Sequence, residues 1–215
     1  PNFIGDSINT IPAIELVRQV FPQARITLLG PSFLKELFEY DPRISYIIVS
    51  NKRKKNYFRN IFVILRNRYD LGILFTNTFM TALLLRLALV KRLVGYENEG
   101  RGFLLNFKRP LNRNVHYINR YAMLVNEWLG NKFTCLPTLK LYYKQECNFH
   151  FANNNPVIGL YLGGTNKRFR RYPEEQAIVL LRMLRNYNLV FIGDSNDAVV
   201  QSSYVRQAMI DNVLD

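Results

Sequence analysis

Short apolar runs alternate with amphipathic stretches along this chain of 215 residues. Runs dense in Ile, Leu and Val, which are typical of buried strands, occupy residues 25–30, 45–49, 71–75 and 92–95. Stretches with apolar residues at helical spacing occupy residues 31–40, 56–68, 78–90 and 115–129. In the second of these stretches the apolar face holds Phe58, Ile61, Phe62 and Leu65. The alternation predicts an α/β fold in which helices cover both faces of a parallel sheet.

The same pattern starts again after a polar break. Residues 144–156 contain the run Asn153–Asn155 and are typical of a linker. Beyond them the sequence predicts strands at 157–162 and 189–193 and helices at 173–185 and 195–209. We therefore expect one domain over residues 1–143, a linker over 144–156 and the start of a second domain over 157–215. We also expect a strand to precede Pro1 and the second domain to continue beyond Asp215.

The charge balance indicates an anionic partner. Lys and Arg total 29 against 16 Asp and Glu, a formal net charge of +13. Nucleic acid, an anionic membrane surface and an acidic small molecule or glycolipid all remain open. The cluster Lys52–Lys55 would suit an acidic glycolipid at a membrane surface, although most charge runs are simply solvated. The longest apolar run, 79–90, is too short for a membrane span, which takes about 20 residues, so we expect a soluble or peripheral protein.

The metal-binding residue types are sparse. The two cysteines, Cys135 and Cys147, have the spacing of neither a zinc clip nor a redox pair, and the only histidines are His116 and His150. Two thiols in a reducing cytosol are the simpler interpretation. No Asp-x-Asp motif, the usual divalent-metal handle of nucleotide-sugar enzymes, occurs in the sequence. Any bound diphosphate would then have its charge offset by Lys, Arg and helix dipoles.

Three loops follow predicted strands or begin helices, where open α/β sheets bind ligands. In the first, Asp6 follows Gly5 and comes just before the helix containing Pro12. A carboxylate there could act as a general base on a sugar hydroxyl. It could equally be a helix-capping or turn residue, which the bare sequence favours.

The other two loops lie in the second half of the chain. Gly163, Gly164 and Thr165 lead into four cations that include Arg170, and a helix follows. Bare backbone N–H groups, a hydroxyl and nearby cations are what a phosphate needs, although a solvated basic loop has the same composition. The third loop runs from Gly193 to Asp197 and could help to hold a ribose or base. A polar turn with Asp194 or Ser195 as the helix cap is the simpler interpretation.

Taken in order, several segments resemble glycosyltransferase family nine, the heptosyltransferases. Residues 1–6 with Pro12 resemble the family's opening loop and first helix, and residues 21–26 its FPxARI step. Residues 77–82 are similar to an NSFxSA stretch, and 95–96 with 100–106 to a GY…GRxxLLN stretch, both typical of second heptosyltransferases. Residues 116–121 resemble the HxxxRY helix, and 163–173 and 193–197 the family's donor loops.

This resemblance implies two Rossmann-like domains that face a cleft, the GT-B arrangement. It implies an inverting, metal-independent transfer of heptose from ADP-heptose, with no cofactor. The implied acceptor lies in the inner core of lipopolysaccharide and is either Kdo on lipid A or a core that already carries a heptose. By the same resemblance Asp6 is the general base. The implied donor residues are Gly163, Gly164, Thr165, Arg170, Gly193 and Asp197, and the implied acceptor residues are Asn77, Thr78, Arg101 and Arg120. The expected location is the cytoplasm, with peripheral contact at the anionic inner face of the membrane.

The sequence departs from the family at three places, and at one of them the family's PGA becomes Leu162-Gly163-Gly164. Arg170-Arg171-Tyr172-Pro173 stands where the family has Lys-Arg-Trp-Pro, and an arginine fork contacts phosphate differently from a lysine. The family's later DSGxxHxA segment does not occur in these 215 residues, so we expect them alone to have little transferase activity. The second-heptose enzyme is favoured over the first or another core-sugar transferase. A basic nucleic-acid-binding protein stays an alternative, although no nucleic-acid-binding motif occurs, and a catalytically inactive scaffold is a third.

Overall fold

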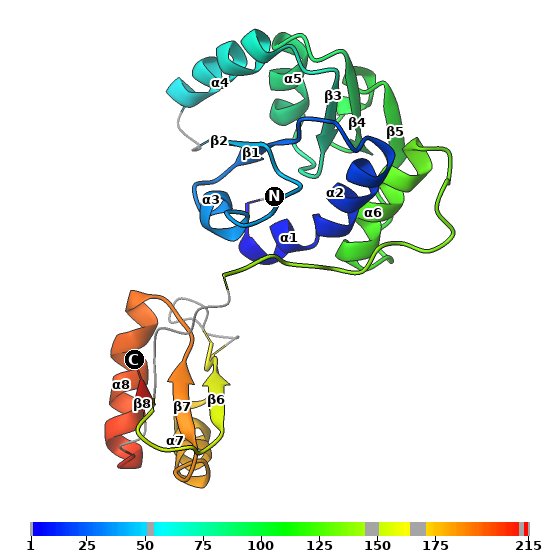
Figure 1. Ribbon diagram of the computed structural model, residues 1–215. Coiled ribbons are helices and arrows are strands. Elements are labelled where there is room, and N and C mark those ends of the chain that lie inside the picture. The colour runs from blue at the N-terminus through cyan, green and yellow to red at the C-terminus, as the bar shows by residue number, and fades with distance from the viewer. Residues whose placement is uncertain (1, 51–53, 145–150, 164–170, 211–212, 215) are drawn as a thin grey trace. The chain divides into compact units, whose positions relative to one another are not determined.

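The computed structural model describes residues 2–50, 54–144, 151–163, 171–210 and 213–214. The chain divides into two compact units, residues 1–145 and 146–215, and this division falls inside the predicted linker. Each unit is built on parallel strands with helices packed against them (Figure 1). The α/β class that the alternating pattern predicts is therefore confirmed.

The strands of the first unit form two parallel sheets. The strands are β1 (Thr27–Gly30), β2 (Tyr46–Val49), β3 (Leu71–Leu74), β4 (Arg92–Glu97) and β5 (Phe107–Pro110). The helices are α1 (Ile4–Ile8), α2 (Ile11–Val20), α3 (Leu34–Leu37), α4 (Lys54–Asn67), α5 (Phe79–Leu87), the 3-10 helix η1 (Arg101–Leu104) and α6 (Tyr117–Trp128). One sheet is β1–β2 and the other β3–β4–β5. The sequence did not predict β5 or η1, because residues 107–110 have only one apolar side chain between them besides proline.

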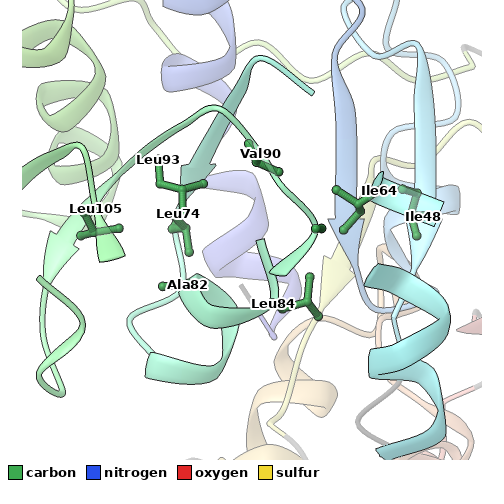
Figure 2. Packing of buried hydrophobic residues seen from close by; sticks show 9 residues of the cluster. Ile48, Ile64, Leu74, Ala82, Leu84, Val90, Leu93 and Leu105 are labelled. Carbon is green, nitrogen blue, oxygen red and sulfur yellow. The ribbon is translucent and has the colours of Figure 1, made fainter. Parts of the chain in front are cut away.

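Alternating side chains on the central strands point to opposite faces. On one face Leu74 and Leu93 join a cluster with residues of α4 and α5, which Figure 2 shows around Ile64, Ala82 and Leu84. On the other face the neighbouring residue Ile73 packs against α2 and α6. Figure 1 shows α2 and α6 side by side, in agreement with their extensive contact. Helices thus cover both faces of the β3–β4–β5 sheet, as predicted.

Helix α4 is turned differently from the sequence-based expectation. Its inner side holds Asn60 and Ile64, which are 0% and 2% exposed. Phe58 and Phe62 instead lie on the outside, 70% and 69% exposed. Two apolar stripes compete on this helix, and the smaller one around Ile64 fits against Ile48 and Leu84 in the core. The apolar face that the sequence indicates on this helix is therefore exposed at Phe58 and Phe62.

The edges of β1 and β3 line a single large cavity. Its volume is about 990 Å³, and its walls include Thr27–Gly30 of β1 and Leu71–Leu74 of β3. A hydrogen bond of 3.0 Å from the Tyr69 hydroxyl to the Thr27 hydroxyl connects the two sheets at their amino ends. Asn2 lies at the wall as well. A parallel strand in this space would find apolar walls and two open strand edges, and a strand before Pro1 stays a prediction.

A buried ion pair fixes the turn before β2. Arg43 is 5% exposed and Asp41 1% exposed by side chain, and the Arg43 Nη2–Asp41 Oδ2 distance is 2.6 Å. Arg43 also contacts Glu15 of α2 at 3.0 Å and donates to the Lys140 carbonyl at 2.8 Å. Although burial opposes the charge, hydrogen bonds and attraction to Asp41 and Glu15 raise the pKa of Arg43. The guanidinium thereby ties the β2 turn to α2 and to the end of the unit.

The second unit has a three-stranded parallel sheet in the order β6–β7–β8. Its elements are β6 (Val157–Leu160), α7 (Glu174–Met183), β7 (Asn188–Phe191), α8 (Ser195–Ala208) and β8 (Val213–Leu214). Helices α7 and α8 pack together, and Leu181, Leu189 and Tyr204 are central to their shared apolar cluster. The opposite face of the sheet shows Val157 and Tyr161, which are 53% and 62% exposed. No helix in the described part of the chain is long and apolar enough to cross a bilayer.

Candidate functional site

Asp6 lies in a helix and not in an open loop. It is the third residue of α1, and residues 4–8 close into a helical turn in which the Asn9 N–H donates to the Gly5 carbonyl at 3.1 Å. The sequence-based prediction of a loop before the Pro12 helix is corrected in this respect. Ser7 and Thr10 line the large cavity together with Gly30 and Thr76, which end or follow strands. Helix α1 therefore sits at the carboxyl edge of the strands, where α/β folds bind ligands.

The Asp6 carboxylate is half-buried, so part of it is open to solvent. Among the described residues it takes part in no hydrogen bond or ion pair, so the capping role that the bare sequence favours has no partner there. Its negative charge acts on Tyr121 of α6. Burial, and then the negative charge of Asp6, raise the pKa of Tyr121 to about 12 against the opposing charge of Arg120. The Tyr121 ring packs edge-on against Phe75 at 5.1 Å, which connects the Asp6 region to the end of β3.

The loop after β3 carries the predicted acceptor residues Asn77 and Thr78. Thr78 precedes α5 as its N-cap residue, and its hydroxyl lies 3.2 Å from that of Thr81. The Thr76 hydroxyl donates to the same Thr81 oxygen at 3.0 Å. At the start of α5 the Phe79 N–H donates to the Glu99 carboxylate at 3.0 Å. The loop therefore presents hydroxyl and amide groups at the carboxyl edge of the sheet, and it is held from both sides.

Arg101 lies beneath this loop. It is 0% exposed, and burial lowers the pKa of its guanidinium. Its Nε donates to the Tyr96 carbonyl at 2.8 Å, its Nη1 to the Thr76 carbonyl at 2.6 Å, and its Nη2 to Asn77 Oδ1 at 3.4 Å. All three nitrogens are thus used by the protein itself. In this structure Arg101 positions the Asn77–Thr78 loop, and direct contact with an acceptor stays a prediction.

Arg120 of α6 is also withdrawn from the surface, at 5% exposure. Its guanidinium stacks over the Tyr117 ring at 4.3 Å and donates to the carbonyls of Arg113 and Val115 at 3.2 and 2.9 Å. Its Nε has no hydrogen-bond partner among the described residues. This buried cation with an unused donor acts on Tyr121, whose ring also feels the charge of Asp6.

In the second unit the two predicted donor loops meet. Gly163 follows β6 with a φ of +90°, a left-handed conformation that favours glycine. It shares a small cavity with Arg171, Asp197 and Tyr204. Arg171 donates to the Tyr204 hydroxyl through Nε at 3.0 Å and through Nη2. Sequence reasoning did not select Arg171 or Tyr204, and the only signal for Arg171 was its place in the basic run.

The third loop closes onto α8. A Cβ on Gly193 would lie 2.8 Å from the Asp197 Cβ, so the backbone needs glycine for this close approach. The Asp197 N–H donates to Asp194 Oδ1 at 3.1 Å, and the Asp194 N–H donates to Asp197 Oδ2 at 3.2 Å. This reciprocal pair is a capping box for α8. Asp197, 5% exposed, therefore has a structural task beside its predicted part in donor binding.

Three predicted donor residues, Gly164, Thr165 and Arg170, lie outside the described residues, as does Cys147. Cys135 is an exposed free thiol. In the described ranges no group of three or more His, Cys, Asp or Glu side chains lies close enough together to hold a metal ion.

Comparison with known proteins decides the family. The model of glycosyltransferase family 9 (heptosyltransferase) matches residues 59–212, well over half of the chain. The chain belongs to glycosyltransferase family 9. The resemblance that the ordered motifs indicate is thereby confirmed. The match begins within α4 and runs through the rest of the first unit and nearly all of the second.

Two relatives extend the comparison over most of the sequence. Lipooligosaccharide heptosyltransferase 2 of Haemophilus ducreyi is 22% identical and covers 93% of this chain, which spans 63% of that protein. Lipopolysaccharide heptosyltransferase 2 of Escherichia coli K12 is 22% identical over 92% of this chain and 62% of its own length. The chain thus spans a little under two thirds of these family 9 relatives.

The fold is shared with a solved structure of the family. The structure of E. coli ADP-heptose lps heptosyltransferase II matches with a TM-score of 0.83 at 21% identity, over 99% of this chain and 69% of that one. At this level of identity the match establishes the fold.

Proposed function

We propose that the complete protein is a glycosyltransferase that moves heptose from ADP-heptose to the inner core of lipopolysaccharide, with the second heptose position favoured. The family 9 match over residues 59–212 carries the proposal. The two relatives compared above match over more than nine tenths of this chain and are both named heptosyltransferase 2, which supports the choice of position. The first-heptose enzyme is the nearest alternative within the same fold.

Asp6 is the proposed general base. An Asp6 carboxylate oxygen takes the proton of an acceptor hydroxyl while that oxygen attacks the anomeric carbon of the donor. The bond between this carbon and the diphosphate oxygen breaks, ADP leaves with the electron pair, and the anomeric configuration inverts. The proposal is supported by the place of α1 at the carboxyl edge of the strands and by a half-buried carboxylate without a hydrogen-bond partner among the described residues.

The second unit is the proposed donor-binding unit. Gly163 and Gly193 let the backbone approach the diphosphate closely, and Gly164, Thr165 and Arg170 are the further ligands that the family resemblance implies. Arg171 joins this set, because the structure places it beside Gly163 and Asp197. Guanidinium groups pair with phosphate oxygens in a bidentate manner and could offset the charge of the leaving ADP without a metal ion.

The first unit is the proposed acceptor-binding unit. Asn77 and Thr78 supply polar groups at the end of β3, and Arg120 supplies a buried positive charge beside Tyr121. Arg101 acts through the loop that it holds and is therefore a positioning residue. Acceptor binding and transfer should both suffer when this loop is loosened, since a displacement of about 1 Å can cost a hundredfold in rate.

The test uses the protein expressed from its complete reading frame. ADP-heptose is incubated in the presence of EDTA with two acceptors, one that carries only Kdo on lipid A and one that already carries a heptose. Mass spectrometry measures the gain of one heptose. We expect a gain on the heptose-bearing acceptor that persists in EDTA. A gain only on the Kdo acceptor would assign the first position, loss of activity in EDTA would contradict metal independence, and no gain on either would contradict heptose transfer.

A further inference from the structure

Helix α4 carries an apolar stripe that the first unit does not bury. Phe58 and Phe62 are one helical turn apart, so their side chains lie on the same side of the helix. Their exposures of 70% and 69% contrast with 2% for Ile64 on the inner side. Burying a phenylalanine side chain stabilises a fold, so leaving two of them in water forgoes considerable stabilisation. Such an exposed pair indicates a binding surface.

Cations surround this stripe. Arg59 and Arg66 are exposed on the same helix, next to Phe58 and one turn beyond Phe62. Among the described residues neither takes part in an ion pair, and Arg59 donates to the Val49 carbonyl at 3.2 Å. Between Ile44 and Tyr69 the sequence contains seven Lys and Arg residues and no Asp or Glu. The segment is therefore a strongly positive region around an apolar line.

The combination fits an anionic bilayer better than other partners. An amphipathic helix with Phe on its apolar side and Lys or Arg around it lies in the plane of the interface, with the apolar side chains about 5–10 Å into the headgroup region. Anionic headgroups attract each Lys or Arg side chain that comes close to the bilayer surface. Single-stranded nucleic acid would prefer a groove that places aromatic rings along the path of the backbone, whereas Phe58 and Phe62 stand on the outer side of a helix.

We propose that α4 is a membrane-docking helix, in which Phe58 and Phe62 enter the headgroup–acyl boundary of an anionic bilayer and Arg59 and Arg66 contact lipid phosphates. This surface is separate from Asp6, and the proposal does not depend on heptose transfer. It specifies which face of the first unit meets the membrane.

The experiment measures sedimentation of the complete protein with vesicles of phosphatidylcholine alone or with added phosphatidylglycerol. We expect binding to the anionic vesicles and at least tenfold weaker binding to the neutral ones, in proportion to the cationic residues that reach the surface. The double variant Phe58→Ser/Phe62→Ser should lose about tenfold or more of this binding. The variant Arg59→Gln/Arg66→Gln should lose about tenfold or more as well, and its residual binding should depend less on salt.

Matched controls remove the same kinds of side chain elsewhere. Met183→Ser/Val199→Ser replaces two apolar residues that are 74% and 72% exposed on α7 and α8. Lys132→Gln/Arg185→Gln removes two exposed charges outside α4. We expect both controls to bind vesicles like the unaltered protein, and all variants to keep its thermal unfolding midpoint and its activity on a delipidated acceptor oligosaccharide.

Several results would overturn the docking proposal. They are equal binding to neutral and anionic vesicles, unchanged binding of either α4 variant, or equal losses in the α4 variants and the controls. Loss of RNA binding in the α4 variants with intact vesicle binding would assign the surface to nucleic acid instead. Activity on the delipidated acceptor reports separately on heptose transfer, so failure of one proposal leaves the other distinguishable.

Discussion

Replacing Arg101 with methionine removes a fully buried cation of similar length. Two short charge-assisted hydrogen bonds are lost, to the Tyr96 carbonyl at 2.8 Å and the Thr76 carbonyl at 2.6 Å. Bonds to a charged group contribute about 1.5–3 kcal/mol each, which gives a gross loss of about 3–6 kcal/mol. Burial of the Arg101 charge has a desolvation cost, which also lowers the pKa of Arg101. Methionine carries no charge and avoids this cost, so the net loss of stability is about 2–4 kcal/mol.

Urea denaturation followed by circular dichroism measures this loss as a change in the free energy of unfolding. Arg101→Lys should be less stable than the unaltered protein but more stable than Arg101→Met, because an ammonium keeps the charge but cannot reproduce the guanidinium fork. Hydrogen exchange should quicken at the amide of Phe79, which is bonded to Glu99 at the loop that Arg101 holds. The control is Arg92→Met, since Arg92 is exposed, and its cost should stay within about 0.5 kcal/mol.

The reasoning on Arg101 would be refuted if Arg101→Met cost less than about 1 kcal/mol, the net value of one ordinary hydrogen bond. Loss of acceptor affinity with stability and loop exchange unchanged would show instead that Arg101 meets the acceptor directly, as the family resemblance implies.

Three further perturbations follow from the packing. Asp41→Asn should lower the free energy of unfolding of the first unit, measured in urea, by about 3 kcal/mol, because Glu15 is then the one carboxylate paired with the buried Arg43 cation in the described structure. If Glu15→Gln lowered it by the same amount, the dominant role of Asp41 would be contradicted. The raised pKa of Tyr121 means that its neutral form stabilises the fold below pH 10 and that this contribution is lost as the pH rises towards about 12. Tyr121→Phe should make the fall in stability between pH 10 and about 12 less steep. An unchanged slope of stability against pH would contradict a contribution from Tyr121. An apolar strand added upstream of Pro1 should raise the unfolding temperature and slow amide exchange at the β1 and β3 edges, whereas unchanged exchange there would argue against a strand in the cavity.

Most strands and helices could be predicted because their signals are local. The run at residues 71–75 is apolar at every position but one, and β3 forms there because both of its faces are covered by helices. The turn at Gly193 was also readable, since a glycine between a strand and a helix indicates close packing of the backbone. The capping box of Asp194 and Asp197 has the residue types and spacing that sequence rules describe.

The errors arise where tertiary packing decides. The sequence pattern indicates an apolar face on α4 with Phe58 and Phe62, but the space beside Ile48 and Leu84 accepts Ile64 instead. An arginine in a polar loop is expected at the surface, yet Arg101 is buried and donates to the carbonyls of Tyr96, Thr76 and Thr78. Asp6 was correctly placed near the helix that contains Pro12, but the extra turn of α1 has no strong sequence signal.

The central claim is that Asp6 is the base in an inverting transfer, and the most direct measurement is the rate of the Asp6→Asn variant. With the complete protein, ADP-heptose and the heptose-bearing acceptor, we expect kcat to fall by about 10²–10⁴. The KM for ADP-heptose and the unfolding temperature should hardly change, because Asp6 has no hydrogen-bond partner among the described residues. A variant whose kcat stays within about tenfold of the unaltered protein would contradict the account, since proton transfer would then not depend on this carboxylate.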